Sequence, residues 1–149
     1  MSTFDPNAFL NQTIDEANST ISVPVPEAEY MAIADAPKIG TWQKKDGSAS
    51  GMKLELDWVI PDSALAEELG RKEVKVRQQI MLDTTETGGL DVGRGRNVAL
   101  GRLREALDLN TPGKPFSFAM IAGRQAKINV KHRVDGDAIY AEVKAVAKA

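Results

Sequence analysis

Nine consecutive positions, residues 52–60, alternate between apolar side chains and mainly polar ones, and no other run in the chain alternates so cleanly. The apolar positions are Met52, Leu54, Leu56, Trp58 and Ile60, and the positions between them are Lys53, Glu55, Asp57 and Val59. A period of two predicts a β-strand with one buried face. The chain must therefore build a sheet that covers a core on one side.

Weaker alternation predicts four more strands, at residues 28–36, 74–82, 125–134 and 139–146. A short helix is expected at residues 62–70, with Asp62 or Ser63 as its cap and Gly70 as its end. A second helix is expected at residues 98–108, capped by Asn97. The connections are a polar loop at 38–51, a glycine-rich loop at 84–96 and a hairpin turn at 135–137. Residues 116–122 fit either a turn of helix or a short strand.

This order predicts a mainly β fold with one or two short helices. Five strands with a helix between the third and the fourth match an OB-like five-stranded Greek-key barrel. Such barrels bind nucleic acid on the face of strands 2 and 3, and through the loops that join strands 1–2 and 4–5. Here those loops are residues 38–51 and 135–138. A β-sandwich or half-barrel with one helix is the alternative.

The length of 149 residues fits one folded domain. Residues 1–26 are expected to form an acidic N-terminal arm, in which residues 7–17 favour a short helix and the Pro24 and Pro26 region stops it. Residues 27–149 form the OB-like domain. The chain has no cysteine, no apolar run long enough to cross a membrane and no secretory leader, so a cytoplasmic location is expected.

Charge is distributed unevenly along the chain, although the formal net charge is only −2. Residues 1–37 contain six acids and no lysine or arginine, which gives −6. Residues 91–133 contain nine basic residues and three acids, which gives 9 − 3 = +6. A local excess of this size can attract a polyanion in spite of the net charge.

Few residues suit catalysis. His132 is the one histidine, and its strand register predicts an inward, hydrogen-bonded structural role. Zinc lacks its usual nitrogen and sulfur ligands in this chain, and no G-x-S-x-G elbow is present. Asp135 and Asp137 fit a tight turn. We therefore expect a protein that is not an enzyme and holds no cofactor, with a magnesium-dependent nuclease as the least favoured alternative.

Three cations at alternate positions of one predicted strand make the most informative basic surface, namely Lys127, Lys131 and Arg133. Lys75 and Arg77 extend this surface if the third strand lies nearby. Arg94 and Arg96 suit phosphate contact from the glycine-rich loop, where they are expected to close over the groove, although a solvated loop is an equal alternative. Acids on the outer face of residues 52–60 oppose phosphate binding there.

Single-stranded nucleic acid also needs aromatic side chains on which bases stack. Trp42 is the first candidate, because it lies in the predicted polar loop beside Lys44 and Lys45. Tyr140 is the second, on the outer face of the last strand. Trp58 fits the core.

Four segments carry a resemblance to a known group of proteins: residues 4–10 (FDPNAFL), 26–30 (PEAEY), 101–107 (GRLREAL) and 123–133 (GRQAKINVKHR). They resemble small proteins of tailed bacteriophages described as single-stranded-DNA-binding proteins with an OB-like domain. The resemblance covers most of residues 4–147 and implies a role among phage replication and recombination functions. Unlike bacterial single-strand-binding proteins, the chain has no acidic C-terminal tail, so an element that recruits partner proteins is expected in the acidic arm.

The leading hypothesis is a sequence-independent single-stranded-DNA-binding protein that acts in phage DNA replication and recombination. The alternative is a structural or interaction module, a virion component or a host-factor binder. In that case the basic face meets an acidic protein, such as the arm of a neighbouring subunit in a homo-oligomer.

Overall fold

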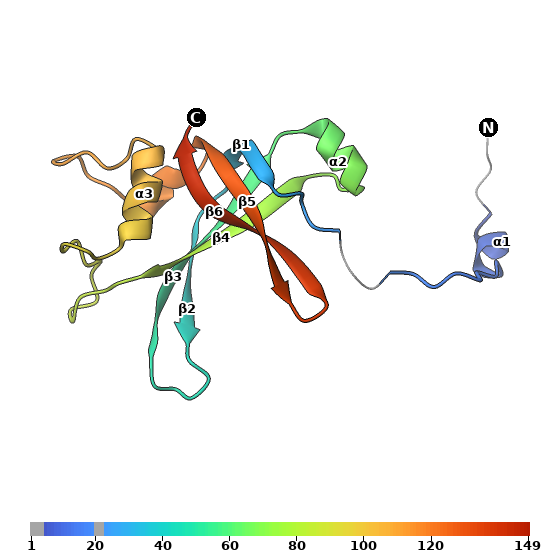
Figure 1. Ribbon diagram of the computed structural model, residues 1–149, viewed down its shortest axis with the longest axis horizontal. Helices are drawn as coiled ribbons and strands as arrows, with labels where there is room; N and C mark the ends of the chain where they lie inside the picture. Colours follow the sequence, from blue (N-terminus) through green and yellow to red (C-terminus); the bar gives the residue numbers. More distant parts are fainter. Residues whose placement is uncertain (1–4, 20–22) are drawn as a thin grey trace.

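A computed structural model describes residues 5–19 and 23–149 of the chain (Figure 1). Within them the fold is mainly β, with six strands, three short α-helices and one 3-10 turn. In chain order the elements are α1 (Pro6–Leu10), β1 (Ala28–Ala34), β2 (Lys38–Gln43), β3 (Ser50–Ile60), α2 (Ser63–Leu69), β4 (Val74–Leu82), α3 (Val98–Ala106), η1 (Phe118–Ile121), β5 (Gln125–Asp135) and β6 (Ala138–Lys148). The predicted mainly β class is confirmed.

The six strands form one mixed sheet in the order β1-β5-β6-β4-β3-β2. An additional pairing of β1 with β3 joins five of these strands into a ring. All neighbours are antiparallel except β4 and β6, which are parallel and share the single pair Arg77 and Glu142. Because β4 and β6 share so little of their length, they diverge on both sides of this pair.

The predicted polar loop at residues 38–51 is wrong, because its first part is strand β2. β1 and β2 lie one after the other along the same edge of β3, with Ala34 opposite Trp58 and Lys38 opposite Glu55. Between them the Asp35 amide still donates to the Asp57 carbonyl oxygen at 2.9 Å. Only the turn at residues 44–49 remains a loop, so β2 and β3 form a hairpin.

The core lies inside the ring and is built by the predicted alternation. Leu54, Leu56 and Trp58 of β3 are at most 1% exposed, while the residues between them face outward. The Trp58 indole N–H donates to Gln78 Oε1 at 2.9 Å, which satisfies the polar atom of a fully buried ring. α3 contributes Leu100 and Leu103, each 1% exposed.

The two predicted helices have different starts. α2 begins as predicted, because Asp62 Oδ1 accepts from the Leu65 amide at 3.1 Å, and it ends at Gly70 with a left-handed φ of 65°. α3 starts after Asn97, but the Asn97 side chain makes no capping bond and its backbone is left-handed, with φ at 50°. That side chain is used elsewhere, as described below.

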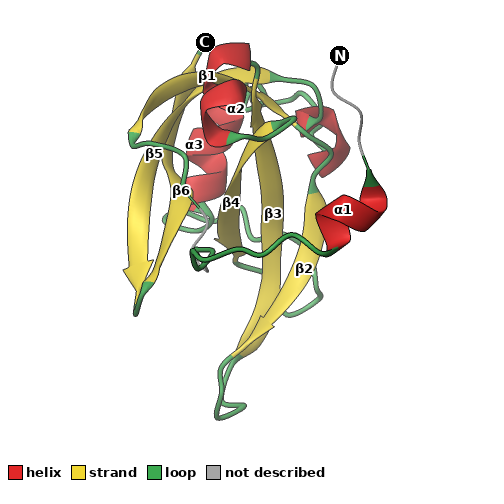
Figure 2. Cartoon of the chain, turned by 90° about the vertical axis from the view of Figure 1, so that its right-hand side faces the viewer, coloured by secondary structure: helices red, strands yellow, loops and turns green. Residues whose placement is uncertain are grey.

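The N-terminal segment leaves the ring on the side of α2 (Figures 1 and 2). Helix α1 is shorter than the predicted 7–17, and every residue from 5 to 19 is exposed. Val25 is 1% exposed and lies in the core, where its carbonyl oxygen is 2.7 Å from His132 Nε2. The predicted structural role of His132 fits this contact, and the ring is part-buried rather than fully enclosed.

Candidate nucleic-acid interface

The divergence of β4 and β6 opens a groove of about 390 Å³ on the outer face of the sheet. The side chains that line it come from both strands and from β5: Arg77, Gln79, Met81, Arg133, Tyr140, Ala141, Glu142 and Val143. Three of the eleven residues predicted to bind nucleic acid therefore meet here, namely Arg77, Arg133 and Tyr140. Gln79, Met81 and Glu142 were not predicted.

Arg133 and Tyr140 form the aromatic part of the groove. They lie opposite each other in the β5–β6 hairpin, and the guanidinium carbon is 4.8 Å from the centre of the tyrosine ring. The Tyr140 side chain is 47% exposed, so its ring remains accessible to a partner. This is the arrangement of a cation stacked on an aromatic face. It offers a flat surface that carries positive charge.

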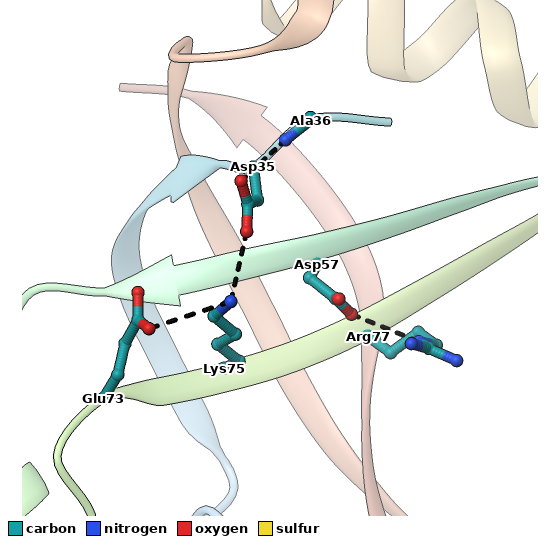
Figure 3. Close-up of polar contacts among 6 residues, drawn as sticks. All are labelled: Asp35, Ala36, Asp57, Glu73, Lys75 and Arg77. Atoms are coloured by element: carbon teal, nitrogen blue, oxygen red, sulfur yellow. Dashed lines mark hydrogen bonds and ion pairs between the residues drawn. The ribbon is translucent and has the colours of Figure 1, made fainter. Parts of the chain in front are cut away.

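Both arginines of the groove are already paired with carboxylates. Arg133 Nε donates to Glu142 Oε1 at 2.6 Å, and Arg77 Nε donates to Asp57 Oδ1 at 3.1 Å (Figure 3). The hydrogen bond to Glu142 raises the pKa of Arg133, and the bond to Asp57 raises the pKa of Arg77. The pairs are solvent-exposed, so each contributes little to stability.

The strand register continues this pairing into a row of alternating charge. Lys131 of β5 lies opposite Glu142 of β6, Glu142 lies opposite Arg77 of β4, and Arg77 lies opposite Asp57 of β3. The predicted basic surface is therefore nearly neutral at its centre. Glu142 is the central acid of this row, because cations lie on both sides of it and Arg133 binds it directly.

Lys75 forms ion pairs outside this row. Its ammonium lies 3.1 Å from Asp35 Oδ2 and 3.7 Å from Glu73 Oε2 (Figure 3). The bond to Asp35 raises the pKa of Lys75, while the Ala36 amide and then Lys75 lower the pKa of Asp35. Lys75 does not line the groove between β4 and β6. Its side chain reaches from β4 across β3 to the junction between β1 and β2.

Lys44, Lys45 and Lys127 make no ion pair within residues 5–19 and 23–149. Lys44 and Lys45 lie in the turn of the β2–β3 hairpin, which the Lys44 amide closes by donating to the Ala49 carbonyl oxygen at 2.8 Å. Lys127 lies six residues before Arg133 on β5, about 20 Å away along the strand. The lysines of the hairpin turn are therefore charged side chains without a carboxylate partner, whereas Lys127 belongs to another part of the surface.

The prediction that Trp42 is a loop residue is wrong. It lies on β2 opposite Gly51, and its half-buried ring is packed on that glycine. A Cβ atom at position 51 would be only 2.8 Å from Trp42 Nε1, so no side chain fits beneath the ring. The indole nitrogen is buried without a hydrogen-bond partner in the part of the chain that is described. A ring held in this way has little freedom to stack on a base.

The prediction that Arg94 and Arg96 close over the groove is not supported by their positions, because neither lines it. The glycine-rich loop that carries them is fixed at its base by Asn97. The Asn97 side chain donates to the carbonyl oxygens of Asp83 and Asp91, both at 2.8 Å, and accepts from the Asp83 amide at 2.7 Å. Arg96 lies 3.8 Å from Asp91 within the same loop.

A signal for the missed residues was present in the alternation of the strands. Met81 occupies an outward position of β4 and is 56% exposed, although its side chain is apolar. Glu142 occupies an outward position of β6 next to Tyr140 in the same alternation. One such residue is ordinary, but Met81 and Tyr140 at outward positions of two strands together indicate a contact surface.

Comparisons with protein-family models and with curated protein sequences gave no match for this chain. Among the described residues there is no cluster of three or more histidine, cysteine or acidic side chains that could hold a metal ion. No helix within the same residues has the length and apolar character needed to cross a membrane.

Proposed function

We propose that the protein binds single-stranded DNA without sequence preference, across the outer face of β3, β4 and β6. The proposal includes the identity of the ring as an OB-type barrel. Numbered in chain order, the ring strands β1, β3, β4, β5 and β6 follow one another around the ring as 1-2-3-5-4, and α3 lies between strands 3 and 4. This agrees with the Greek-key order of the OB-fold.

The groove between β4 and β6 is the observation that carries the proposal. It lies beside the outer face of strands 2 and 3 of the ring, where OB-type barrels bind nucleic acid. The hairpins β2–β3 and β5–β6 extend from the ring on the same side of the molecule (Figure 1). They occupy the places of the loops that join strands 1–2 and 4–5, and these loops complete OB-type sites.

Each part of the groove has a role in this proposal. A base stacks on the Tyr140 ring beside the Arg133 guanidinium, and the exposed Met81 side chain supplies apolar contact. Lys44, Lys45 and Lys131 attract the phosphates, while Arg77 and Arg133 exchange their carboxylate partners for phosphate oxygens. None of these contacts reads base edges in a fixed pattern, so binding is insensitive to sequence.

The resemblance to tailed-phage proteins supports a role for this activity in phage DNA replication and recombination. In that setting the protein protects single strands in the host cytoplasm and performs no catalysis of its own. The acidic arm provides contacts with other proteins, including further copies of this chain.

A salt series with labelled oligothymidine tests the proposal. The logarithm of the binding constant should fall with the logarithm of salt concentration by about 0.7 for each phosphate contacted. The oligothymidine should remain intact when magnesium is added. Duplex DNA should bind more weakly, because its paired bases are not available to stack on Tyr140. Absence of binding at low salt would overturn the proposal, and magnesium-dependent cleavage would replace it with the nuclease alternative.

A further inference from the structure

A second groove, of about 370 Å³, lies between the glycine-rich loop and α3, away from the proposed DNA site. Its apolar part is formed by Leu90, Val92, Val98 and Leu100. Val92 is 82% exposed and Val98 is 47% exposed, although both are β-branched hydrocarbons. Two exposed valines beside the partly buried Leu90 give the hollow an apolar floor on which an apolar side chain can pack.

The shape of this groove is fixed before any partner binds. Asn97 lies where the loop meets α3 and has a left-handed backbone, which a residue other than glycine rarely adopts. Four hydrogen bonds hold it there. Its amide donates to Asp83 Oδ2 at 3.0 Å, and its side chain makes three further bonds to the backbone of Asp83 and Asp91. A loop end held by four hydrogen bonds indicates that the shape of the groove is set before a partner binds.

The polar lining of the groove has an excess of positive charge. Arg96, Arg102 and Arg104 line it together with the acids Asp91 and Glu105. Arg104 is occupied, because it donates to the Leu109 carbonyl oxygen at 3.0 Å and its guanidinium lies 4.2 Å from the centre of the Phe116 ring. Asp91 accepts from the Gly93 amide at 2.9 Å and lies 3.8 Å from Arg96, so Arg96 is also occupied. The exposed Arg102 makes no ion pair within the described residues, so it is available to an acidic partner.

Residues 5–19 of the N-terminal arm have the complementary character. All of them are exposed, and the apolar side chains Phe9, Leu10 and Ile14 are 66%, 79% and 73% exposed. Asp5, Asp15 and Glu16 accompany them, and no lysine or arginine occurs before residue 38. An acidic segment with large exposed apolar side chains matches an apolar groove with a basic rim.

We propose that this arm docks in the α3 groove of a second copy of the chain. A second copy is favoured over the same copy because the arm and α3 lie at opposite ends of the long axis of the molecule (Figure 1). The arm is anchored at the buried Val25, so Ile14 can extend about 35 Å from the ring. Because the two contact surfaces differ, the contact is head-to-tail and continues from copy to copy.

Paramagnetic labelling of the full chain tests the docking site directly. The chain has no cysteine, so Thr13→Cys accepts a single spin label on the arm. Spin-labelled protein at natural isotope abundance is mixed with ¹⁵N-labelled protein that carries no spin label. No DNA is present. Amide signals of residues 90–102 should broaden. The proposal would be overturned by broadening at other residues or by no broadening. It would also be overturned if broadening occurred only in molecules that carry both the ¹⁵N label and the spin label, because the arm would then dock on its own copy.

Charge exchange tests the chemistry of the contact, with association measured by sedimentation equilibrium. Arg102→Glu should weaken association by about fivefold, and Asp15→Lys combined with Glu16→Lys should do the same. A variant that carries all three substitutions should associate as strongly as the unaltered protein. Lys72→Glu, which reverses one exposed charge next to α2, is the matched control and should have no effect. Failure of the joined variant to regain association would contradict the proposal. The docking rests on the self-contact of the acidic arm that the proposed function includes. Neither experiment contains DNA, so failure of the docking would leave the proposed DNA binding untouched.

Discussion

The two hairpins that extend from the ring differ in how their charged and aromatic side chains are held. In the β5–β6 hairpin, Arg133 is paired with Glu142 and lies over an exposed Tyr140 ring. In the β2–β3 hairpin the arrangement is reversed. Lys44 and Lys45 have no carboxylate partner in the described residues, and the aromatic ring of Trp42 is packed on Gly51.

Unpaired positive charge and an accessible aromatic ring are therefore found in different hairpins of this molecule. One hairpin offers long-range attraction without a stacking surface, and the other offers a stacking surface whose charge is largely neutralised. If the protein binds single-stranded DNA as we propose, attraction of the strand and stacking of its bases therefore depend on different residues. Substitutions in the two hairpins should change different measured quantities.

Tyr140→Ala should have the largest effect, because it removes the accessible stacking ring. Base stacking on an aromatic side chain contributes about 1–3 kcal/mol, so affinity for oligothymidine should fall about tenfold or more. The salt slope should remain unchanged, as measured by fluorescence anisotropy over a salt series. Tyr140→Phe keeps the ring and should bind as the unaltered protein does. Equal losses in both variants would show that the hydroxyl, not the ring, is important.

Lys44→Ala combined with Lys45→Ala should have the next largest effect on affinity. Unlike Tyr140→Ala, it should also change the salt slope. Losing two phosphate contacts should reduce the salt slope by about 1.4 and weaken binding at low salt by about fivefold. Lys72→Ala combined with Lys148→Ala removes two exposed lysines far from the groove and serves as the control. An unchanged salt slope in the Lys44 and Lys45 variant would contradict the proposal that the β2–β3 hairpin supplies phosphate contacts.

Glu142→Gln should strengthen binding by about threefold, because it removes the central acid of the charge row. Among the described residues it leaves Arg133 with only the more distant Asp135, 3.9 Å away, as a carboxylate partner. The gain should be greatest at low salt and should diminish as salt screens the exposed groups. Glu105→Gln, an exposed acid on α3, is the matched control. Weaker binding by Glu142→Gln would show that the carboxylate positions Arg133 for its ligand.

Gly51→Ala should lower the free energy of unfolding by about 1–2 kcal/mol with little effect on DNA affinity. The added methyl group would meet the Trp42 ring at 2.8 Å, so the ring must move. Chemical denaturation and tryptophan fluorescence measure the two consequences. A tenfold change in affinity would show instead that Trp42 is part of the DNA site.

The smallest effect on stability is expected at Glu27, which follows the arm directly. Its side chain contacts β5 away from both hairpin turns. Its Oε2 accepts from the His132 amide at 2.9 Å, and this bond lowers the pKa of Glu27. Its stabilising contribution is therefore present above the ordinary value of 4.5 and is lost as pH falls through the lower folded value. Thermal melts of Glu27→Gln should differ from the unaltered protein at pH 7 and converge with it in acid. A constant difference across this range would contradict the assignment.

The sequence predicted those parts of the fold that depend on local patterns. The alternation of β3 and the Asp62 and Gly70 ends of α2 were predicted because each requires only neighbouring residues. β2 was missed because Gly40 and Trp42 occupy one face of it, which hides the alternation. The contact of Arg133 with Tyr140 could have been predicted from the sequence, because a tight turn at residues 135–138 sets the register of the hairpin.

The neutralised charge row could not be predicted from the sequence. It depends on the pairing of Arg77 with Glu142, which lie on parallel strands far apart in the chain. No local pattern sets that register, because the two strands are brought together by closure of the ring. The sequence indicated that acids lie on the outer face of residues 52–60, while the pairing of particular arginines with Asp57 and Glu142 was found only in three dimensions.

The most direct test of the account is a map of the DNA contact on the full chain. ¹H–¹⁵N spectra recorded during titration with oligothymidine should show the largest shifts at residues 77–81, 131–133 and 140–142. Smaller shifts, sensitive to salt, are expected at residues 44 and 45, and none at α2. Shifts confined to residues 90–102, or spread evenly over the surface, would contradict the claim that DNA crosses the groove between β4 and β6.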